Sequence, residues 1–257
     1  MIVQRLTDYI WVGLDSVLSE SPITYVARAF YSLKTGLKKL HSYYKSLNPT
    51  GDAPIDSRYF PSITAYRHAT GRVEFKYVGF LENCPDCITL RARTMMEPIQ
   101  DIVVKFVDRY GQRAHQILAD EDLAPKLLYC GSPHFDEDEP SYQSISMVVM
   151  EYIDGDTLSV AKKNKMSEES AETVRSTVRR ALELLHSHGL VFGDLRAPNI
   201  MITKNGKVKL IDFNWAGEGG QAKYPSLISS EIAWPEGVKA LAVMRREHDL
   251  DMLSRLI

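Results

Sequence analysis

The stretch HGLVFGDLRAPNIMI, residues 188–202, places an acid and an amide in a turn-rich break of the chain. Asp194 and Asn199 lie five residues apart, and Gly193 and Pro198 stand beside them. Glycine and proline interrupt regular structure, so this segment is predicted to be a loop between a helix and an apolar strand. Polar side chains that a loop holds between two ordered elements are candidate functional groups.

The segments on both sides of this loop predict a helix and a β-hairpin. Ser167 followed by Glu168 and Glu169 is a typical helix start, and Gly189 is a typical end. Apolar residues spaced by three and four give this helix one buried face: Ala171, Val174, Val178, Ala181 and Leu185. After the loop, the runs IMIT (200–203) and VKLIDF (208–213) lie on either side of KNGK (204–207), whose Asn-Gly pair predicts a hairpin turn.

Between residues 63 and 153 the sequence pattern changes to that of β-strands. Five runs are rich in Val, Ile, Phe, Tyr and Thr: GRVEFKYVGFL (71–81), CITLRART (87–94), DIVVKFV (101–107), PKLLYCG (125–131) and YQSISMVVMEYI (142–153). A short helix is predicted at QRAHQILADE (112–121), and the acidic turn SPHFDEDEP (132–140) is predicted to be a solvated loop. The pattern indicates an antiparallel sheet with one helix inserted.

The first 48 residues predict helices, and NPTGDAPIDSRYFPS (48–62) predicts a linker rich in Pro, Gly, Asp and Ser. Steps of three and four in residues 23–47 draw an apolar stripe on one face of a helix: Ile23, Val26, Phe30, Leu33, Leu37, Leu40 and Tyr44. Such a stripe must pack on another surface. We expect it to dock on the rest of the protein near QRAHQILADE, and a dimer contact or a partner-binding arm is the alternative.

The chain has 257 residues, of which 44% are hydrophobic and 25% charged, with a net charge of −2. This composition suits one large globular domain or two lobes. It disfavours nucleic acid as the main partner, because no broad basic field surrounds the protein. There is no run of about 20 apolar residues and no clear signal peptide, so no membrane partner is expected and the expected location is intracellular, cytoplasmic or nuclear.

The three cysteines do not suggest a disulfide framework, because their number is odd and no secretory signal precedes them. Cys84 and Cys87 have the spacing of half a zinc site, yet no second pair of ligands follows at a suitable spacing. An ordinary tight turn is the preferred interpretation, and a metal or redox pair is the alternative.

The loop at 188–202 resembles the catalytic loop of the protein-kinase superfamily, whose familiar form is His-Arg-Asp-Leu-x-x-x-x-Asn. Phe192 and Gly193 stand in the first two positions here, and GDLRAPN is closer to the Gly-Asp-Leu form of fungal kinase-like, RIO-type and small-molecule kinases. The resemblance implies that Asp194 orients the acceptor hydroxyl and takes its proton. It also implies that Asn199 holds Mg²⁺ near the phosphates of ATP.

Further parts follow in the order that this resemblance requires. Asp212-Phe213-Asn214, eighteen residues after Asp194, resembles Asp-Phe-Gly and makes Asp212 the principal Mg²⁺ ligand. IVVK (102–105) resembles the Val-Ala-Ile-Lys strand and makes Lys105 the lysine that pairs with the phosphates. MVVMEYIDGD (147–156) resembles the hinge strand. For the nucleotide the resemblance implies Met150 as gatekeeper, Glu151, Tyr152 and Ile153 at the adenine, Asp154 or Asp156 near the ribose, and Met201.

Weaker similarity extends the match over residues 63–257. Pro235-Glu236 resembles the end of an activation segment, and HDLDML (248–253) resembles the helix whose Asp supports the catalytic loop, with Asp249 as first choice and Asp251 as second. The implied fold is α+β and bilobal: an N-terminal helical extension with its linker (1–62), an N-lobe (63–153) and a C-lobe (154–257). Because the chain stops as the supporting helix begins, the C-lobe is expected to be minimal or truncated.

The sequence departs from the kinase pattern in the N-lobe. A kinase covers the phosphates with Gly-x-Gly-x-x-Gly, whereas GFLENCPDC (79–87) has Gly79 alone, so a tight turn at Asn83-Cys84-Pro85 is a candidate cover. The inserted helix has His115 where a glutamate is expected to pair with Lys105, and Glu121 is the nearest acid. His115 is interpreted as a packed histidine, with a catalytic role as the alternative.

A further departure precedes Asp194, where the usual Arg is missing. Control by a phosphate on the segment 215–234 is therefore not expected. That segment nevertheless contains candidate autophosphorylation sites: Tyr224, Ser226, Ser229 and Ser230.

The sequence therefore favours an ATP- and Mg²⁺-dependent phosphotransferase that uses Lys105, Asp194, Asn199 and Asp212. A protein Ser/Thr kinase is the first interpretation, because EYIDGDTL and WPEG resemble protein kinases. A choline- or aminoglycoside-like small-molecule kinase is the alternative that ILADEDLAPKLL and the Gly-Asp-Leu form favour. A pseudokinase scaffold would explain the poor glycine loop, but not why three oxygen donors for magnesium are kept together. No feature indicates the oligomeric state.

Overall fold

The computed structural model describes residues 20–46, 60–69, 71–81, 89–133 and 145–256. The chain divides into two compact units, Met1–Phe60 and Pro61–Ile257. The predicted turn at Asn83-Cys84-Pro85, the pair Cys84 and Cys87, most of the predicted linker and most of the acidic loop lie outside the described residues. Within the described ranges, no helix combines the length and the apolar character needed to cross a bilayer.

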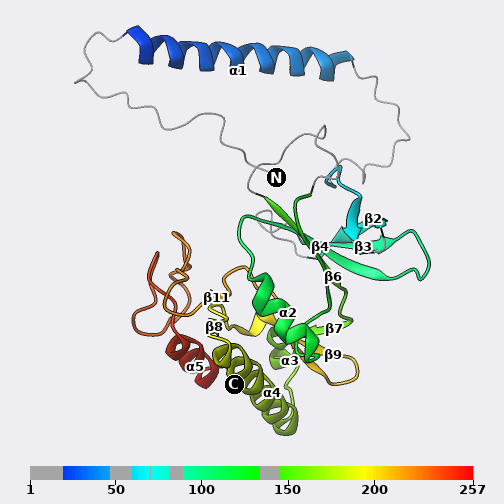
Figure 1. Cartoon of the computed structure of the whole chain (residues 1–257), viewed down its shortest axis with the longest axis vertical. Helices are drawn as coiled ribbons and strands as arrows, with labels where there is room; N and C mark the ends of the chain where they lie inside the picture. Colours follow the sequence, from blue (N-terminus) through cyan, green and yellow to red (C-terminus); the bar gives the residue numbers. More distant parts are fainter. Residues whose placement is uncertain (1–19, 47–59, 70, 82–88, 134–144, 257) are drawn as a thin grey trace. The chain divides into compact units, whose positions relative to one another are not determined.

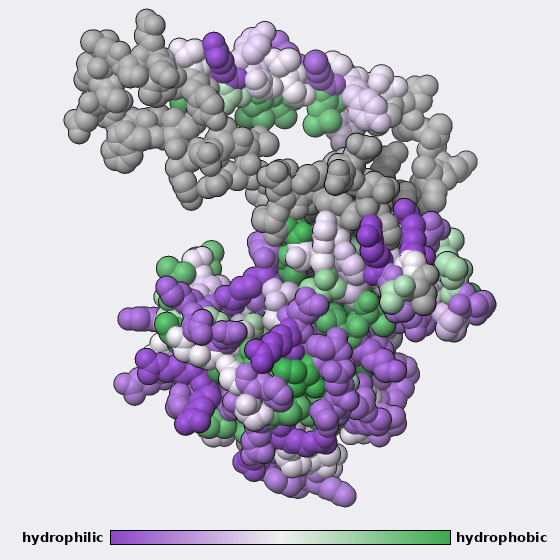
Figure 2. All heavy atoms as spheres, viewed as in Figure 1, coloured by the Kyte–Doolittle hydropathy of each residue, from purple (hydrophilic) through white to green (hydrophobic). Residues whose placement is uncertain are grey.

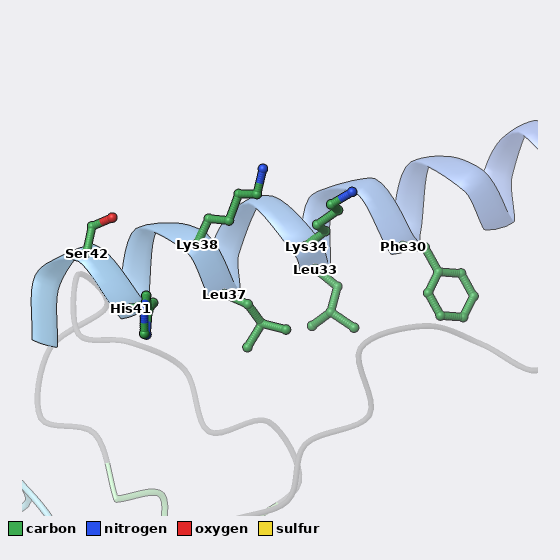
Figure 3. Close-up of a pocket in the computed structure, with 7 residues that line it drawn as sticks. All are labelled: Phe30, Leu33, Lys34, Leu37, Lys38, His41 and Ser42. Carbon is green, nitrogen blue, oxygen red and sulfur yellow. The ribbon is translucent and has the colours of Figure 1, made fainter. Parts of the chain in front are cut away.

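The described element of the first unit is the helix α1 (Glu20–Ser46), shown in blue in Figure 1. Phe30, Leu33 and Leu37 project from one side of it, whereas Lys38 and Ser42 project from another (Figure 3). Five residues of the stripe, Phe30, Leu33, Leu37, Leu40 and Tyr44, are exposed, with Phe30 at 66% and Leu37 at 57% of their full accessible surface. The predicted helix is therefore confirmed, and the surface on which its stripe docks stays a prediction.

The second unit begins with a six-stranded antiparallel sheet in the order β1-β2-β3-β4-β6-β5. Its strands are β1 (Ala65–His68), β2 (Gly71–Phe80), β3 (Thr89–Thr94), β4 (Asp101–Val107), β5 (Leu127–Gly131) and β6 (Ser146–Glu151). The five predicted strands are confirmed, and β1 is an additional edge strand. In the central strand β4, Ile102, Val103 and Val104 are all buried, which explains its continuous apolar run.

The helix α2 (Gln112–Asp120) connects β4 to β5 and confirms the predicted inserted helix. Its buried residues are Ala114, His115 and Leu118. It packs against β5 and against a long helix of the C-terminal part, α4 (Glu168–Ser187), and Figure 1 shows it between the sheet and α4. The inserted helix therefore lies where the two lobes meet.

The rest of the second unit combines helices with short strands. These are β7 (Gly155–Thr157), α3 (Leu158–Lys163), α4, β8 (Leu190–Val191), the 3-10 helix η2 (Ala197–Asn199), β9 (Ile200–Thr203), β10 (Val208–Leu210), β11 (Gly217–Glu218) and α5 (Arg246–Ser254). The predicted start of α4 is confirmed, because the Ser167 hydroxyl accepts a hydrogen bond from the Ser170 amide. The predicted hairpin is also confirmed, as β9 and β10, with β7 as a third strand that was not predicted.

One hydrophobic core joins α2, α4 and the predicted catalytic loop. Leu182, Leu185, Phe192, Leu195 and Phe213 are fully buried in it. Leu195 follows Asp194 and Phe213 follows Asp212, so both candidate acids are attached to the same close-packed interior. Figure 2 shows that hydrophilic residues cover most of the visible outer face of this unit.

Candidate active site

The loop that leads to Asp194 is held by a buried carboxylate on α5. Asp249 accepts hydrogen bonds from the amides of Phe192 (2.9 Å) and Gly193 (2.8 Å), and His186 Nε2 lies 3.0 Å from its Oδ2. Asp249 is 1% exposed. Of the two candidates, it is the one that contacts this loop.

The backbone conformation and the packing at position 193 explain why a glycine precedes Asp194. Its φ is +81°, a region that side chains disfavour, and a Cβ there would lie 2.6 Å from Met244 Sδ. The glycine therefore lets the loop turn while the buried Met244 packs against it. The Arg of the familiar kinase pattern has no room at this position.

Asp194 is a buried carboxylate whose charge is paired. Arg196 donates to both carboxylate oxygens from one edge of its guanidinium, from Nε to Oδ1 and from Nη2 to Oδ2, the latter at 2.7 Å. Asn199 Nδ2 donates to Asp194 Oδ2 and to the Asp194 carbonyl, both at 2.9 Å. The bonds to Asp194 raise the pKa of Arg196, so the guanidinium stays charged. The structure thus brings Asp194 and Asn199 together, and adds Arg196, which the sequence analysis did not assign.

Asp212 faces the N-lobe and bonds directly to Lys105. The distance from Lys105 Nζ to Asp212 Oδ1 is 2.8 Å, and the lysine side chain is 12% exposed. Asp212 has a φ of +63°, which is rare for a residue with a side chain and marks a constrained site. The predicted lysine of β4 and the predicted acid after β10 therefore meet across the two lobes.

The polar atoms left at this site fit Mg²⁺. Asp212 Oδ1 bonds to Lys105 and Asn199 Nδ2 bonds to Asp194, which leaves Asp212 Oδ2 and Asn199 Oδ1 as acceptors. Carboxylate and amide oxygens are the hard donors that Mg²⁺ prefers. Among the described residues, no group of three His, Cys, Asp or Glu side chains that could hold a metal ion is found.

Neither His115 nor Glu121, the two residues considered opposite Lys105, pairs with this lysine. His115 does not face the lysine, because Nδ1 bonds to Tyr110 (2.7 Å) and Nε2 to the Pro125 carbonyl (2.8 Å). Glu121 is paired with Arg180 on α4 at 2.9 Å. The interpretation of His115 as a packed histidine is confirmed, since it is fully buried, and burial lowers its pKa to about 4.

The predicted hinge residues lie at the end of β6. Met150 is buried, and the Glu151 amide donates to the Lys126 carbonyl of the neighbouring strand at 2.9 Å. The Tyr152 amide points to the Asp101 carbonyl at 3.4 Å, so the sheet already uses both amides. The recognition of an adenine ring by these residues stays a prediction.

Two further predicted nucleotide contacts can be located. Asp154 is paired with Lys204 at 2.6 Å, whereas Asp156 is exposed and has Ile202 as its partner in the β7–β9 register. Asp156 is therefore the freer of the two ribose candidates. Met201 is half-buried on β9, two residues after Asn199.

The segment after Asp212 is more closely packed than its Gly- and Ser-rich sequence indicates. Tyr224 is 2% exposed and its hydroxyl lies 3.0 Å from His248 Nδ1, so its proposal as an autophosphorylation site is wrong for this conformation. The serines of the segment, Ser226, Ser229 and Ser230, are exposed. Pro235 is buried.

Comparison with known proteins agrees with this geometry. The family model of the protein kinase domain matches residues 136–249. The serine/threonine-protein kinase PAK 5 of Rattus norvegicus is 28% identical over 125 residues, 46% of this chain and 17% of that protein. The serine/threonine-protein kinase PAK 4 of Homo sapiens is 35% identical over 72 residues, 28% of this chain and 12% of that protein.

The chain spans less than a fifth of the length of these curated relatives. The matched region nevertheless contains Asp194, Asn199 and Asp212, the residues that the fold brings to one site. The sheet with its inserted helix, the helical part that carries the acids, and the match of residues 136–249 to the protein kinase domain together support membership of the protein-kinase superfamily.

Proposed function

We propose that this chain is an ATP- and Mg²⁺-dependent phosphotransferase that moves the γ-phosphate of ATP to a hydroxyl of a protein serine or threonine. The observation that carries the proposal is the bond between Lys105 and Asp212, together with the pairing of Asp194 and Asn199. The two pairs are joined through the backbone, because the amide of Ile211, directly before Asp212, donates to the Asn199 carbonyl at 2.9 Å. Phosphoryl transfer depends mainly on positioning and on neutralising charge, and these are the groups that a protein supplies for it.

Each side chain has a separate task in this proposal. Lys105, only 12% exposed, supplies a fixed positive charge for the α and β phosphates. Asp212 and Asn199 would hold Mg²⁺, which neutralises charge that develops on the phosphate oxygens. Asp194 accepts the proton of the acceptor hydroxyl, and its bonds from Arg196 and Asn199 fix its carboxylate.

Protein is the favoured acceptor because the similar proteins named above are serine/threonine-protein kinases. A small-molecule acceptor is the second candidate, and the Gly-Asp-Leu form of the loop favours it. A pseudokinase scaffold is the third candidate. A scaffold function would not explain why Lys105 pairs with Asp212, since a scaffold needs no cation next to a metal ligand.

Ligand-induced thermal stabilisation tests the nucleotide site. ATP with Mg²⁺ should raise the melting temperature of the full chain more than ATP with EDTA, because Asp212 would hold the metal that accompanies the nucleotide. Asp212→Ala should remove that difference. Equal stabilisation with and without the metal in the wild type would contradict the assignment of Asp212 and Asn199.

A further inference from the structure

We propose that Arg109, together with Gly111 and His115, holds Asp212 in position. This inference rests on the proposed function, because it explains how the site holds its metal ligand. The helix α2 carries a single acid, Asp120, which accepts a hydrogen bond from Gln116 at 2.7 Å. No carboxylate of α2 therefore braces Lys105 or the residues after it, and another group has to do so.

Arg109 contacts the segment after Asp212 at three backbone carbonyls. Its Nε donates to Asn214 O at 3.0 Å, its Nη2 to Trp215 O at 3.2 Å and its Nη1 to Lys223 O at 2.7 Å. Arg109 itself lies between β4 and α2, four residues after Lys105. A planar guanidinium has five N–H donors spread over three nitrogens in fixed directions, so it can hold three separate carbonyls in a fixed arrangement, whereas the donors of an ammonium all lie on one nitrogen.

Gly111 brings the two lobes into backbone contact next to Arg109. Its amide donates to Phe213 O at 2.9 Å. A Cβ at Gly111 would lie 2.6 Å from both the Cβ and the carbonyl oxygen of Ala216. This approach is therefore possible only for glycine, and it fixes the chain directly after Asp212.

His115 fixes the side chain of Phe213 from the other side. Its ring lies parallel to the Phe213 ring, with 4.5 Å between centroids and 4° between planes. The Pro125 carbonyl can only accept, so Nε2 carries the proton and Nδ1 accepts from the Tyr110 hydroxyl. Because both nitrogens are bonded, the ring cannot turn without losing a hydrogen bond.

These contacts hold the backbone on the C-terminal side of Asp212, whose φ of +63° needs such support. They involve main-chain carbonyls and a phenyl ring, and no hydroxyl of the segment. Asp212 is therefore positioned without a phosphate on Ser226, Ser229 or Ser230. We therefore infer that Asp212 is always in position to bind Mg²⁺ and does not depend on phosphorylation of this segment.

The test compares the full-length chain with Arg109→Ala, Arg109→Lys and the control Arg113→Ala. Arg113 is an exposed arginine of α2 whose recorded ion pair, to Glu218, is long at 4.0 Å. Two quantities are measured: amide hydrogen exchange of residues 213–224, and the Mg²⁺ concentration that gives half of the ATP-dependent rise in melting temperature.

We expect Arg109→Ala to speed exchange in residues 213–224 by about tenfold and to raise the Mg²⁺ requirement by a similar factor, because three charge-assisted hydrogen bonds are lost. Arg109→Lys should be intermediate, and Arg113→Ala should match the wild type. Unchanged exchange in Arg109→Ala overturns the inference. Faster exchange with an unchanged Mg²⁺ requirement also overturns it, since Arg109 would then only stabilise the fold.

The two readouts separate this inference from the proposed function. If the wild type shows no Mg²⁺-dependent stabilisation by ATP, the proposed function fails. The exchange measurement needs no ligand, so it still decides whether Arg109 holds the segment that contains Phe213 and Trp215.

Discussion

At the scale of single residues, the active site is built from charges and rings that each have a fixed partner. Asp194 is 4% exposed, and a carboxylate so buried is tolerated because Arg196 and Asn199 pair with it. Burial of His115 has a different result, since its ring is held neutral between Tyr110 and Pro125. The pKa of His115 falls to about 4 because burial disfavours the charged imidazolium.

This pKa predicts a loss of stability in mild acid. The native pKa of His115, about 4, lies below its ordinary value of 6.5, so the unfolded chain binds the proton more readily. The contribution of His115 is fully present above pH 6.5 and is lost as pH falls toward 4. Between pH 7 and pH 4 it should lower the free energy of unfolding by roughly 3 kcal/mol.

Denaturant unfolding at a series of pH values measures this effect. His115→Phe keeps an aromatic ring against Phe213 but cannot titrate, so its unfolding free energy should depend less steeply on pH than that of the wild type. His248, whose pKa is also lowered by burial, titrates in both proteins and cancels in the comparison. Parallel pH profiles for the two proteins would mean that His115 is not held neutral.

At the scale of elements, two glycines of similar backbone conformation have different roles. Gly189, with φ +73°, ends α4 in open space, whereas Gly193, with φ +81°, lies against Met244 in the loop before Asp194. Both alanine variants carry the cost of a positive φ, of order 1–3 kcal/mol. Only at Gly193 does the added methyl group also meet a buried side chain.

Gly193→Ala should therefore lower the melting temperature more than Gly189→Ala, and it should also reduce phosphotransfer by displacing Asp194. Thermal melts together with turnover of the two variants check this. If Gly189→Ala proves equally harmful to turnover, the packing of Gly193 against Met244 is not what positions the loop.

Most of the long elements could be predicted from the sequence, because their signals are local. The strands β2 to β6 have β-branched and aromatic runs, and α4 has a Ser cap and an apolar face. The strands β7, β8 and β11 are two or three residues long and exist through pairing with distant segments, so no local pattern marks them.

The residues of the candidate site also fall into two groups, those that local sequence patterns predict and those that they do not. Asp194, Asn199 and Asp212 could be predicted because their spacing along the chain is characteristic. The role of Arg109 could not, since its three partners are backbone carbonyls 105 to 114 residues away and leave no side-chain pattern. The burial of Tyr224 could not be predicted either, because a Gly- and Ser-rich segment favours an exposed loop. In the structure, Tyr224 packs with Val191 and Met244.

At the scale of the whole molecule, the least explained feature is the helix α1 with its apolar stripe. Burial of a Leu or Phe side chain is worth roughly 1.5–3 kcal/mol, so a stripe that contains Phe30, Leu33, Leu37 and Leu40 favours a covered state. Deleting residues 1–48 should therefore lower the melting temperature of the remainder and increase its binding of an apolar dye. A deletion variant that remains as stable and as monomeric as the full chain would indicate instead that α1 is an arm for another partner.

Transfer of label from γ-labelled ATP tests the central claim most directly, with wild type and Asp194→Asn incubated with Mg²⁺, alone and with a generic protein substrate. The variant keeps the shape of Asp194 but removes the proton acceptor. The wild type should transfer label to protein, and Asp194→Asn should do so about 10²-fold or more slowly while binding ATP as before. A wild type that binds ATP with Mg²⁺ yet transfers no more label than Asp194→Asn would contradict the account and indicate a pseudokinase.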